Sequence, residues 1–160
     1  MRWSVEIRID SPFQAQVQED WLRQAIEATL GSEEFGHSVE LSLLVTGDEI
    51  VQELNRDYRG IDRTTDVLSF AFQEGADSSF PPSANGVFHL GEVIISCPQA
   101  AKQAMEQSHS LRRELTILTI HGVLHLLGYE HQRPQEEGKM RFKENEILAI
   151  LSHQEQYGSI

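Results

Sequence analysis

The stretch HGVLHLLGYEH, residues 121–131, places two histidines four positions apart inside an apolar run. On an α-helix this spacing puts His121 and His125 on one face, one turn apart. Gly128 then allows the backbone to leave the helix in a left-handed conformation, so that the chain reverses and His131 reaches the same point. Three neutral imidazoles that converge in this way predict a zinc site with an open fourth position, which is typical of catalytic zinc.

The spacing of these histidines resembles that of the metzincin proteases, with one difference. Metzincins carry their general base, a Glu, directly after the first His, whereas this chain has Gly122 there. A metal-dependent peptidase or amide hydrolase is therefore an alternative that lacks its proton acceptor. The other alternative is chance placement, but only seven histidines occur in the whole chain, and three at ligand spacing around a helix-ending Gly favour a metal site.

The helix that carries these histidines is expected to be the buried centre of the domain. Ser110 suits its N-cap. The segment that follows is apolar nearly all round, which is typical of a helix packed on every side. Its apolar residues are Leu111, Leu115, Ile117, Leu118, Ile120, Val123, Leu124, Leu126 and Leu127. Histidines buried in such a helix need partners, and a metal ion is a natural one.

The rest of the chain alternates between strand and helix patterns. Apolar residues on alternate positions, or runs of β-formers, predict strands over 2–9, 39–45, 65–72 and 87–95. Helical spacing predicts helices over 14–30, from a capping box at 46–49 to about 58, over 96–106, and from Pro134 onward. The expected fold class is α+β: a single small domain over 1–160, with a four-stranded mixed sheet, about five helices and a central buried helix that carries the metal ligands.

Composition is that of a globular domain. The chain has 160 residues, of which 39% are hydrophobic. No apolar run approaches the roughly 20 residues of a membrane span, so no membrane partner is expected. The N-terminus lacks the apolar core of a signal peptide, and the single Cys97 allows no internal disulfide, which together predict a cytoplasmic protein. Cys97 is expected to be a partly buried small residue and not a nucleophile.

The net charge of -12 is unfavourable for a nucleic-acid partner, because an acidic chain repels phosphate. Basic residues nevertheless gather near the predicted site, interleaved with acids, and they indicate a local positive patch. These residues are Arg56, Arg59, Arg63, Lys102, Arg112, Arg113, Arg133, Lys139, Arg141 and Lys143.

Three stretches together resemble one family, the YbeY-type endoribonucleases, a zinc-dependent group also called rRNA maturation factors. They are NRDYRGIDRTTDVLSF at 55–70, LGEVIIS at 90–96 and the histidine stretch at 121–131. Their order and spacing are those of the family. Three departures are small: Ala71 stands where the family commonly has Pro, and Glu92 and Glu130 stand where it usually has Asp.

The resemblance implies a metal-dependent endoribonuclease that acts on single-stranded RNA in 16S rRNA 3′-end maturation and ribosome quality control. One Zn²⁺ per chain would be held by His121, His125 and His131. Precursor 16S rRNA and proteins of the small ribosomal subunit are the partners it implies. Arg59 matches the family's functionally important arginine and is expected to be catalytic together with His121. Its guanidinium fork suits two phosphate oxygens.

Several alternatives stay open on the sequence alone. Glu130, Asp66 and Glu92 are each candidates for the general base or for a carboxylate that orients a histidine. The attacking group is either water or the 2′-hydroxyl of the substrate. A third possibility is a ribosome assembly factor without catalysis, in which zinc only stabilises the fold. Because the chain is acidic, ribosomal proteins are expected to supply much of its affinity for RNA.

Overall fold

The computed structural model describes residues 3–33, 38–72, 87–129 and 133–157, with side chains described as far as 152. Over these residues it contains a four-stranded sheet, five α-helices and one short 3₁₀ turn, which confirms the predicted α+β class. The elements are β1 (Trp3–Ile9), the 3₁₀ turn η1 (Ser11–Phe13), α1 (Glu19–Gly31), β2 (Ser38–Thr46), α2 (Asp48–Arg59), β3 (Val67–Ala71), β4 (Val87–Ser96), α3 (Cys97–Glu106), α4 (Leu111–Leu126) and α5 (Pro134–Tyr157).

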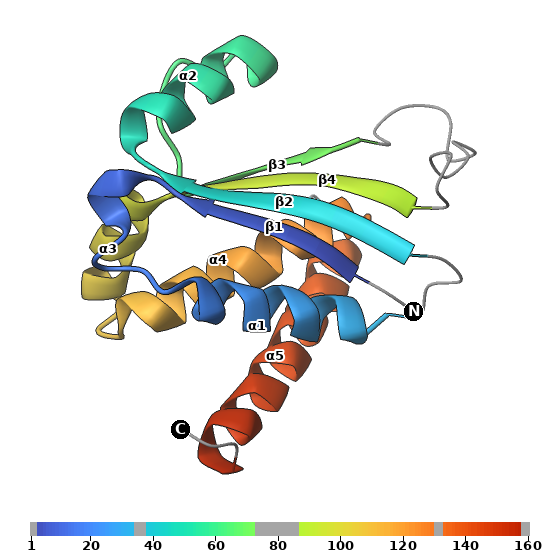
Figure 1. Ribbon diagram of the computed structural model, residues 1–160. Helices are drawn as coiled ribbons and strands as arrows, with labels where there is room; N and C mark the ends of the chain where they lie inside the picture. Colours follow the sequence, from blue (N-terminus) through green and yellow to red (C-terminus); the bar gives the residue numbers. More distant parts are fainter. Residues whose placement is uncertain (1–2, 34–37, 73–86, 130–132, 158–160) are drawn as a thin grey trace.

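The sheet is mixed, with strand order β1-β2-β4-β3. β1 and β4 both run parallel to β2, and β3 runs antiparallel to β4, so β3 forms one edge of the sheet. In Figure 1, α1, α4 and α5 lie on one side of the sheet and α2 on the other. The edge strand β3 therefore lies between α2 on one face of the sheet and α4 on the other.

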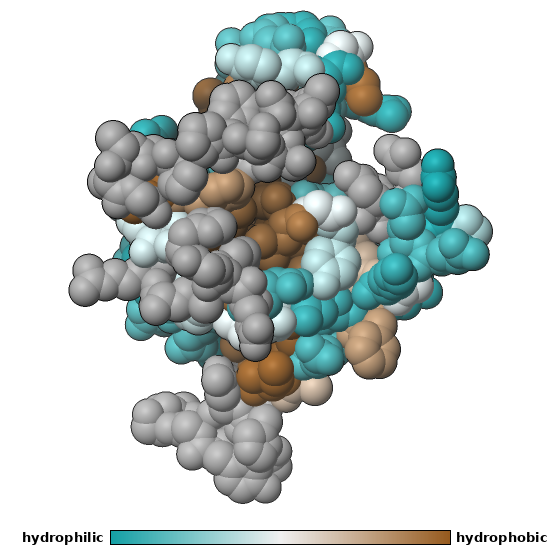
Figure 2. Space-filling view, turned by 90° about the vertical axis from the view of Figure 1, so that its right-hand side faces the viewer, coloured by the Kyte–Doolittle hydropathy of each residue, from teal (hydrophilic) through white to brown (hydrophobic). Residues whose placement is uncertain are grey.

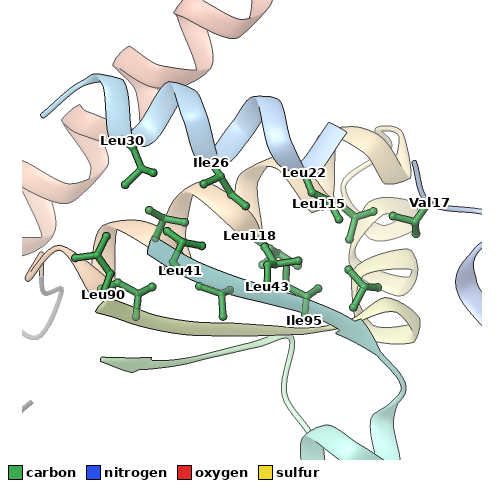
Figure 3. Close-up of a cluster of buried hydrophobic side chains, with 14 of the residues drawn as sticks. Val17, Leu22, Ile26, Leu30, Leu41, Leu43, Leu90, Ile95, Leu115 and Leu118 are labelled. Carbon is green, nitrogen blue, oxygen red and sulfur yellow. The ribbon is translucent and has the colours of Figure 1, made fainter. Parts of the chain in front are cut away.

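The main core fills the space between the sheet and the helices α1 and α4. Inward residues of β2 and β4 meet apolar residues of both helices there, together with Val17, which precedes α1. Figure 3 labels ten residues of this core: Val17, Leu22, Ile26, Leu30, Leu41, Leu43, Leu90, Ile95, Leu115 and Leu118. A smaller cluster of Val51, Leu68 and Ile94 lies under α2 on the opposite face. Burial on both faces explains the apolar run from Val93 to Ile95 on β4, since Val93 and Ile95 belong to the main core and Ile94 to the smaller cluster.

Helix α4 is central, as predicted. Its N-cap is Ser110, whose Oγ accepts a hydrogen bond from the Arg113 backbone N–H at 3.1 Å. Leu115, Ile120, Val123 and Leu124 are fully buried, and they face α1, α5 and the sheet. The Ser96 cap of α3 is also confirmed, since Ser96 Oγ accepts from the Gln99 N–H at 3.3 Å.

Two predicted helix starts are wrong. Thr46 is the last residue of β2 and its hydroxyl donates to Asp10 Oδ2 at 2.7 Å, so Gly47 stands at the N-cap of α2. The helix predicted over 14–30 begins only at Glu19, because a 3₁₀ turn containing Pro12 precedes it. Two acids in the first turn of α1, Glu19 and Asp20, favour this start through the helix dipole.

Strand β3 is shorter than the predicted 65–72. Asp66 precedes it, and its Oδ1 accepts the Val67 N–H at 2.8 Å. The Asp66 carbonyl accepts from the Ser96 N–H at 2.9 Å, where β4 passes into α3. The segment before β3 is thereby fixed to the end of β4.

None of the described helices is both long and apolar enough to cross a membrane.

Candidate functional site

The two histidines of α4 point their Nε2 atoms at each other. His125 Nε2 lies 3.1 Å from His121 Nε2, and the ring planes meet at 78°. Two ligands of a tetrahedral ion with bonds of about 2.0–2.1 Å are about 3.3–3.4 Å apart, so this separation fits a shared zinc ion. The rings are half-buried, with 28% of the His121 side chain exposed. The expectation that they are buried is therefore wrong, and both rings face a cleft.

Glu144 on α5 holds the first of these rings. Its Oε1 lies 2.9 Å from His121 Nδ1, on the side of the ring away from His125. A carboxylate at Nδ1 accepts the ring proton there and leaves the Nε2 lone pair directed at the cleft, as in carboxylate–histidine–zinc triads. Both side chains are partly shielded from solvent, at 28% and 22% exposure. The pair therefore fixes the orientation that a metal-binding imidazole needs.

Sequence analysis missed Glu144, although the predicted last helix contained a signal for it. Met140, Ile147 and Leu151 are buried on the inward face of α5, and Glu144 lies four residues after the first and three before the second. An acid at a core-facing helical position needs a partner. What the sequence does not give is which partner, because His121 is 23 residues away.

The third predicted ligand, His131, lies outside the described residues, as does Glu130. The described chain reverses where the sequence predicts it, at Gly128 with φ +99°. The Gly128 N–H donates to the His125 carbonyl and the Tyr129 N–H to the Leu124 carbonyl, both at 3.0 Å. Within the described residues no three His, Cys, Asp or Glu side chains gather as metal ligands, so the three-histidine site stays a prediction.

Side-chain contacts of Tyr129 and Lys143 hold the turn that begins at Gly128. The Tyr129 hydroxyl donates to Glu33 Oε1 at 2.6 Å, and this bond together with burial raises the pKa of Tyr129 to about 12. Lys143 Nζ donates to the Ser32 carbonyl at 3.0 Å, just after the end of α1. These contacts join α1, α5 and the chain that follows α4. The direction in which the backbone leaves Gly128 is therefore set by tertiary contacts.

Gly122 faces the sheet and has no room for a side chain. A Cβ atom there would lie 2.6 Å from Val93 Cγ1 and 3.3 Å from Ser69 Oγ. The Ser69 hydroxyl also donates to the Gly122 carbonyl at 3.0 Å. The position that carries the general base in metzincins is thus a tight helix–sheet contact, which explains the Gly and counts against the peptidase alternative.

A cleft of about 760 Å³ opens beside the paired histidines and runs along the edge strand β3. Two arginines and two histidines line it, against one acid among the described lining residues. The charged and titratable lining residues are Arg59, Arg63, Asp66, His121 and His125. In a chain with net charge -12, this is a locally basic hollow that suits an anionic ligand. The structure thus brings Arg59 to the same cleft as His121 and His125.

Arg59 is placed by the end of α2. It is the last residue of the helix, and Gly60 terminates the helix at φ +73°, a left-handed conformation that glycine adopts without strain. The guanidinium donates through Nη2 to the Ser69 carbonyl of β3 and lies 5.2 Å above the Phe70 ring. These contacts leave part of its five-donor fork for a ligand in the cleft.

The loop between α2 and β3 is held by buried and partly buried polar side chains. Asn55 Nδ2 donates to the Arg63 carbonyl at 2.9 Å. The Asp48 carboxylate accepts from the hydroxyls of Thr64, at 3.1 Å, and Ser96, at 2.7 Å. Arg63 and its neighbours therefore form a fixed wall of the cleft.

The three acids considered as general base are placed differently. Asp66 lines the cleft, and its carboxylate accepts from the Val67 N–H and, at 3.1 Å, from Gln103 Nε2. Glu92 is exposed and lines a separate hollow beside Arg8, away from the histidines. Cys97 was expected to be partly buried, but it is 1% exposed and belongs to the main core, and burial raises the pKa of its thiol.

The fold and site together define a small α+β domain with an imidazole- and arginine-lined cleft. Comparison with known proteins then gives the family. The family described as Endoribonuclease YbeY matches residues 5–152, and the chain belongs to this family.

Relatives with the same name are similar over most of their length. The Endoribonuclease YbeY of Roseiflexus sp. (strain RS-1) is 44% identical over 149 residues, which is 92% of each chain. That of Pelotomaculum thermopropionicum is 47% identical over 133 residues, covering 82% of this chain and 84% of the relative. The solution structure of TM1509 from Thermotoga maritima shares the fold, with a TM-score of 0.56, 22% identity, and coverage of 97% and 96% of the two chains.

Proposed function

We propose that this protein is an endoribonuclease that hydrolyses phosphodiester bonds of single-stranded RNA with the help of a zinc ion. The family membership and the names of the relatives support an endoribonuclease. The finer proposal is that its substrate is precursor 16S rRNA, cut during 3′-end maturation and ribosome quality control, with small-subunit proteins as partners, as the sequence resemblance implies.

One observation carries the proposal: a single cleft contains a pair of converging imidazoles and an arginine fork. His121 and His125 meet at 3.1 Å, and Arg59 lines the same hollow. Imidazole nitrogens are ligands that zinc prefers, and a guanidinium is the side chain best suited to two oxygens of one phosphate. A phosphodiester that binds in this cleft would meet both.

The donor set fits a catalytic zinc ion. His121, His125 and, as we propose, His131 would hold it, and Glu144 would keep the His121 lone pair on the metal side. When bound, such an ion lowers the pKa of coordinated water towards about 7 and polarises a phosphoryl oxygen. Arg59 would bind the non-bridging oxygens of the scissile phosphate and stabilise the charge that develops on them. Asp66 is the acid among the described lining residues of the cleft and is therefore the candidate general base that we retain.

Removal of Arg59 tests the proposed activity directly. We expect the wild-type protein to cut single-stranded RNA, and Arg59→Ala to lower kcat/KM by about 100- to 1,000-fold, the usual loss when one transition-state donor is removed. Arg59→Lys should recover only part of this, because lysine keeps the charge but lacks the fork. Gel analysis of a labelled oligonucleotide measures both, and the ends of its products distinguish attack by water from attack by the 2′-hydroxyl, which gives a cyclic phosphate.

The matched control for Arg59 is Arg23→Ala. Arg23 pairs with Glu19 on the exposed side of α1, away from the cleft. Its replacement should leave cleavage unchanged, which verifies that loss of one positive charge alone does not matter. Equal rates for the wild type and Arg59→Ala, in preparations free of contaminating ribonuclease, would refute the proposed role of the arginine.

Replacement of Glu144 should act first on the affinity for zinc. We expect Glu144→Ala to weaken zinc binding by about 10- to 100-fold, the usual cost of losing the partner that orients a ligating histidine. Glu144→Gln keeps an oxygen that can accept the Nδ1 proton, and it should recover part of the affinity. Competition with a chromophoric chelator gives the affinity, and the visible spectrum of the Co²⁺-substituted protein reports ligand geometry.

Glu146→Gln is the control for Glu144. Glu146 lies two residues further along α5, where it pairs with Lys143 and is 45% exposed. Its replacement removes the same charge from the same helix but does not touch His121. If it lowers zinc affinity as much as Glu144→Ala, then the effect is one of general charge, and the specific role of Glu144 is wrong.

A second function fits some of the same observations: a zinc-stabilised assembly factor without catalysis. The acidic net charge favours it, because such a chain binds bare RNA weakly. The partly exposed histidines facing the cleft favour an enzyme instead, because structural zinc sites are closed. Chelation separates the two: loss of folding without any RNA cleavage in the zinc-loaded protein supports the assembly factor.

A further inference from the structure

The last turn of α2 carries an aromatic side chain that the core does not use. Tyr58, which directly precedes Arg59, is 72% exposed. The edge of one ring faces the other in its contact with Phe70 on β3, with ring centroids 5.6 Å apart. Most of the area of the Tyr58 ring therefore faces solvent. An aromatic ring in that position contributes little to hydrophobic stabilisation compared with one that is buried.

Tyr58, Arg59 and Phe70 form one group of planar side chains, which we call the aromatic rim. Phe70 is its centre, since the Arg59 guanidinium lies 5.2 Å above the same ring that Tyr58 contacts. Arg59 also lines the cleft of the paired histidines, so the aromatic rim borders that cleft directly. Ile61, 42% exposed, adds an apolar residue on the other side of Gly60 and itself lines the cleft.

Figure 2 shows the side of the molecule on which β3 ends. The surface of α2 at the top of this view is mainly hydrophilic, and hydrophobic residues gather below it, in the middle of the face, between segments drawn in grey. The aromatic rim belongs to the contact between α2 and β3.

The charges on the cleft side of Tyr58 favour an anionic partner. Of the acids nearby in sequence, Asp57 pairs with Arg56 at 3.1 Å, and Asp62 accepts from Gln52 at 3.0 Å. The cleft itself receives Arg59 and Arg63. An exposed aromatic ring next to arginines on a phosphate-binding cleft is the combination by which proteins bind single-stranded nucleic acid.

We propose that Tyr58 is a base-stacking residue, and that the aromatic rim binds an unpaired nucleobase of the RNA strand whose phosphate lies in the cleft. This inference rests on the proposed ribonuclease function and extends it to a subsite. Bases in an A-form duplex are stacked on their neighbours and cannot offer a face to Tyr58, whereas bases of a single strand can. The aromatic rim is therefore a physical source of preference for single strands, independent of sequence.

The test measures affinity for a short single-stranded RNA and for versions of it with one abasic nucleotide at successive positions. Mixing on ice for short times, with gel analysis of the same samples, ensures that the RNA is intact. We expect Tyr58→Ala to bind the intact oligonucleotide roughly 5- to 100-fold more weakly, the range for loss of one base–aromatic stack. Tyr58→Phe keeps the ring and should bind like the wild type.

The abasic series gives the sharper readout. In the wild type, one abasic position should weaken binding as much as Tyr58→Ala does, and in Tyr58→Ala that same position should cost nothing further. A residue that only stabilises the fold would not remove the penalty at one nucleotide. Phe142→Ala is the matched control: Phe142 is 70% exposed on α5, and its removal should change neither the affinity nor the abasic pattern.

The outcomes separate this inference from the proposed function. If the wild type cuts the RNA but Tyr58→Ala binds as tightly, with every abasic penalty intact, then the aromatic rim does not bind a base and serves another partner, such as a protein. If the wild type neither binds nor cuts single-stranded RNA, the proposed function itself fails together with the subsite. Equal wild-type affinity for duplex and single strand would also overturn the role in strand selection.

Discussion

Replacement of His125 by Ala is expected to abolish both metal binding and RNA cleavage. His125 Nε2 faces His121 Nε2 at 3.1 Å, so its removal takes away one of the nitrogens that would hold the ion. Loss of an orienting carboxylate alone costs about 10- to 100-fold in affinity, and loss of a ligand itself should cost roughly 1,000-fold or more. The zinc content measured by elemental analysis should therefore fall from one ion per chain to nearly none, and the rate of RNA cleavage should fall below detection.

The control is another histidine with a carboxylate partner. His89 on β4 pairs with Glu40 on β2, outside the cleft, so His89→Ala should keep both the zinc and the activity. Thermal unfolding of each variant, with and without a chelator, measures how much the ion stabilises the fold. Undiminished cutting by His125→Ala, or one zinc per chain retained in that variant, would refute the metal site.

The features that sequence predicted well are those in which neighbours along the chain decide the outcome. Alternation in residues 39–45 requires one buried face and so predicted β2 within one residue at each end. The spacing of His121 and His125 fixed their common helix face, and Gly128 marked the reversal. In each case the interactions that decide the local structure join residues within about four positions of each other. Hydrophobic periodicity and backbone preference are therefore sufficient to predict it.

The features that sequence did not predict depend on contacts across the fold. Thr46 looks like a helix cap, but its hydroxyl is satisfied by Asp10, 36 residues away, and β2 continues through it. Glu144 reads as an ordinary helix acid until α5 is placed against α4. The sequence did not rank the candidate bases either, because only the fold places Asp66 in the cleft and Glu92, on the inner strand β4, in a separate hollow. These are choices of tertiary packing, which a single sequence does not encode locally.

Gly122 shows how such packing decides the chemistry. Its place directly after the first histidine suggests a protease that has lost its base and could regain it. The structure indicates otherwise, because the absent side chain is what lets α4 approach β3 and β4. A Cβ atom at this position would lie 2.6 and 3.2 Å from the two γ-methyl groups of Val93. Both methyls are fully buried, so neither has free space to move into.

The introduction of Glu at this position is therefore expected to unfold the protein and not to create a peptidase. Overpacking a core costs about 1–3 kcal/mol, and a buried carboxylate without a partner adds several more. The sum for Gly122→Glu, roughly 4 kcal/mol or more, approaches the 5–15 kcal/mol that stabilises a typical domain. Gly122→Ala carries only the steric part, partly offset by about 1 kcal/mol of better helix propensity, and should lose about 0–2 kcal/mol. Urea unfolding measures both.

Two further variants make the steric explanation specific. Gly138 lies at an exposed position of α5 with open space where a Cβ atom would stand, so Gly138→Ala should stabilise the protein by roughly 0.5–1 kcal/mol through helix propensity alone. Val93→Ala removes the methyl groups that a Cβ at 122 would strike, so the double variant Gly122→Ala/Val93→Ala should be more stable than the sum of the single losses predicts. Additive losses would mean that Val93 is not the obstacle. A folded Gly122→Glu with chelator-sensitive peptide cleavage would revive the protease alternative, because α4 would then have tolerated the side chain that the sheet contact forbids.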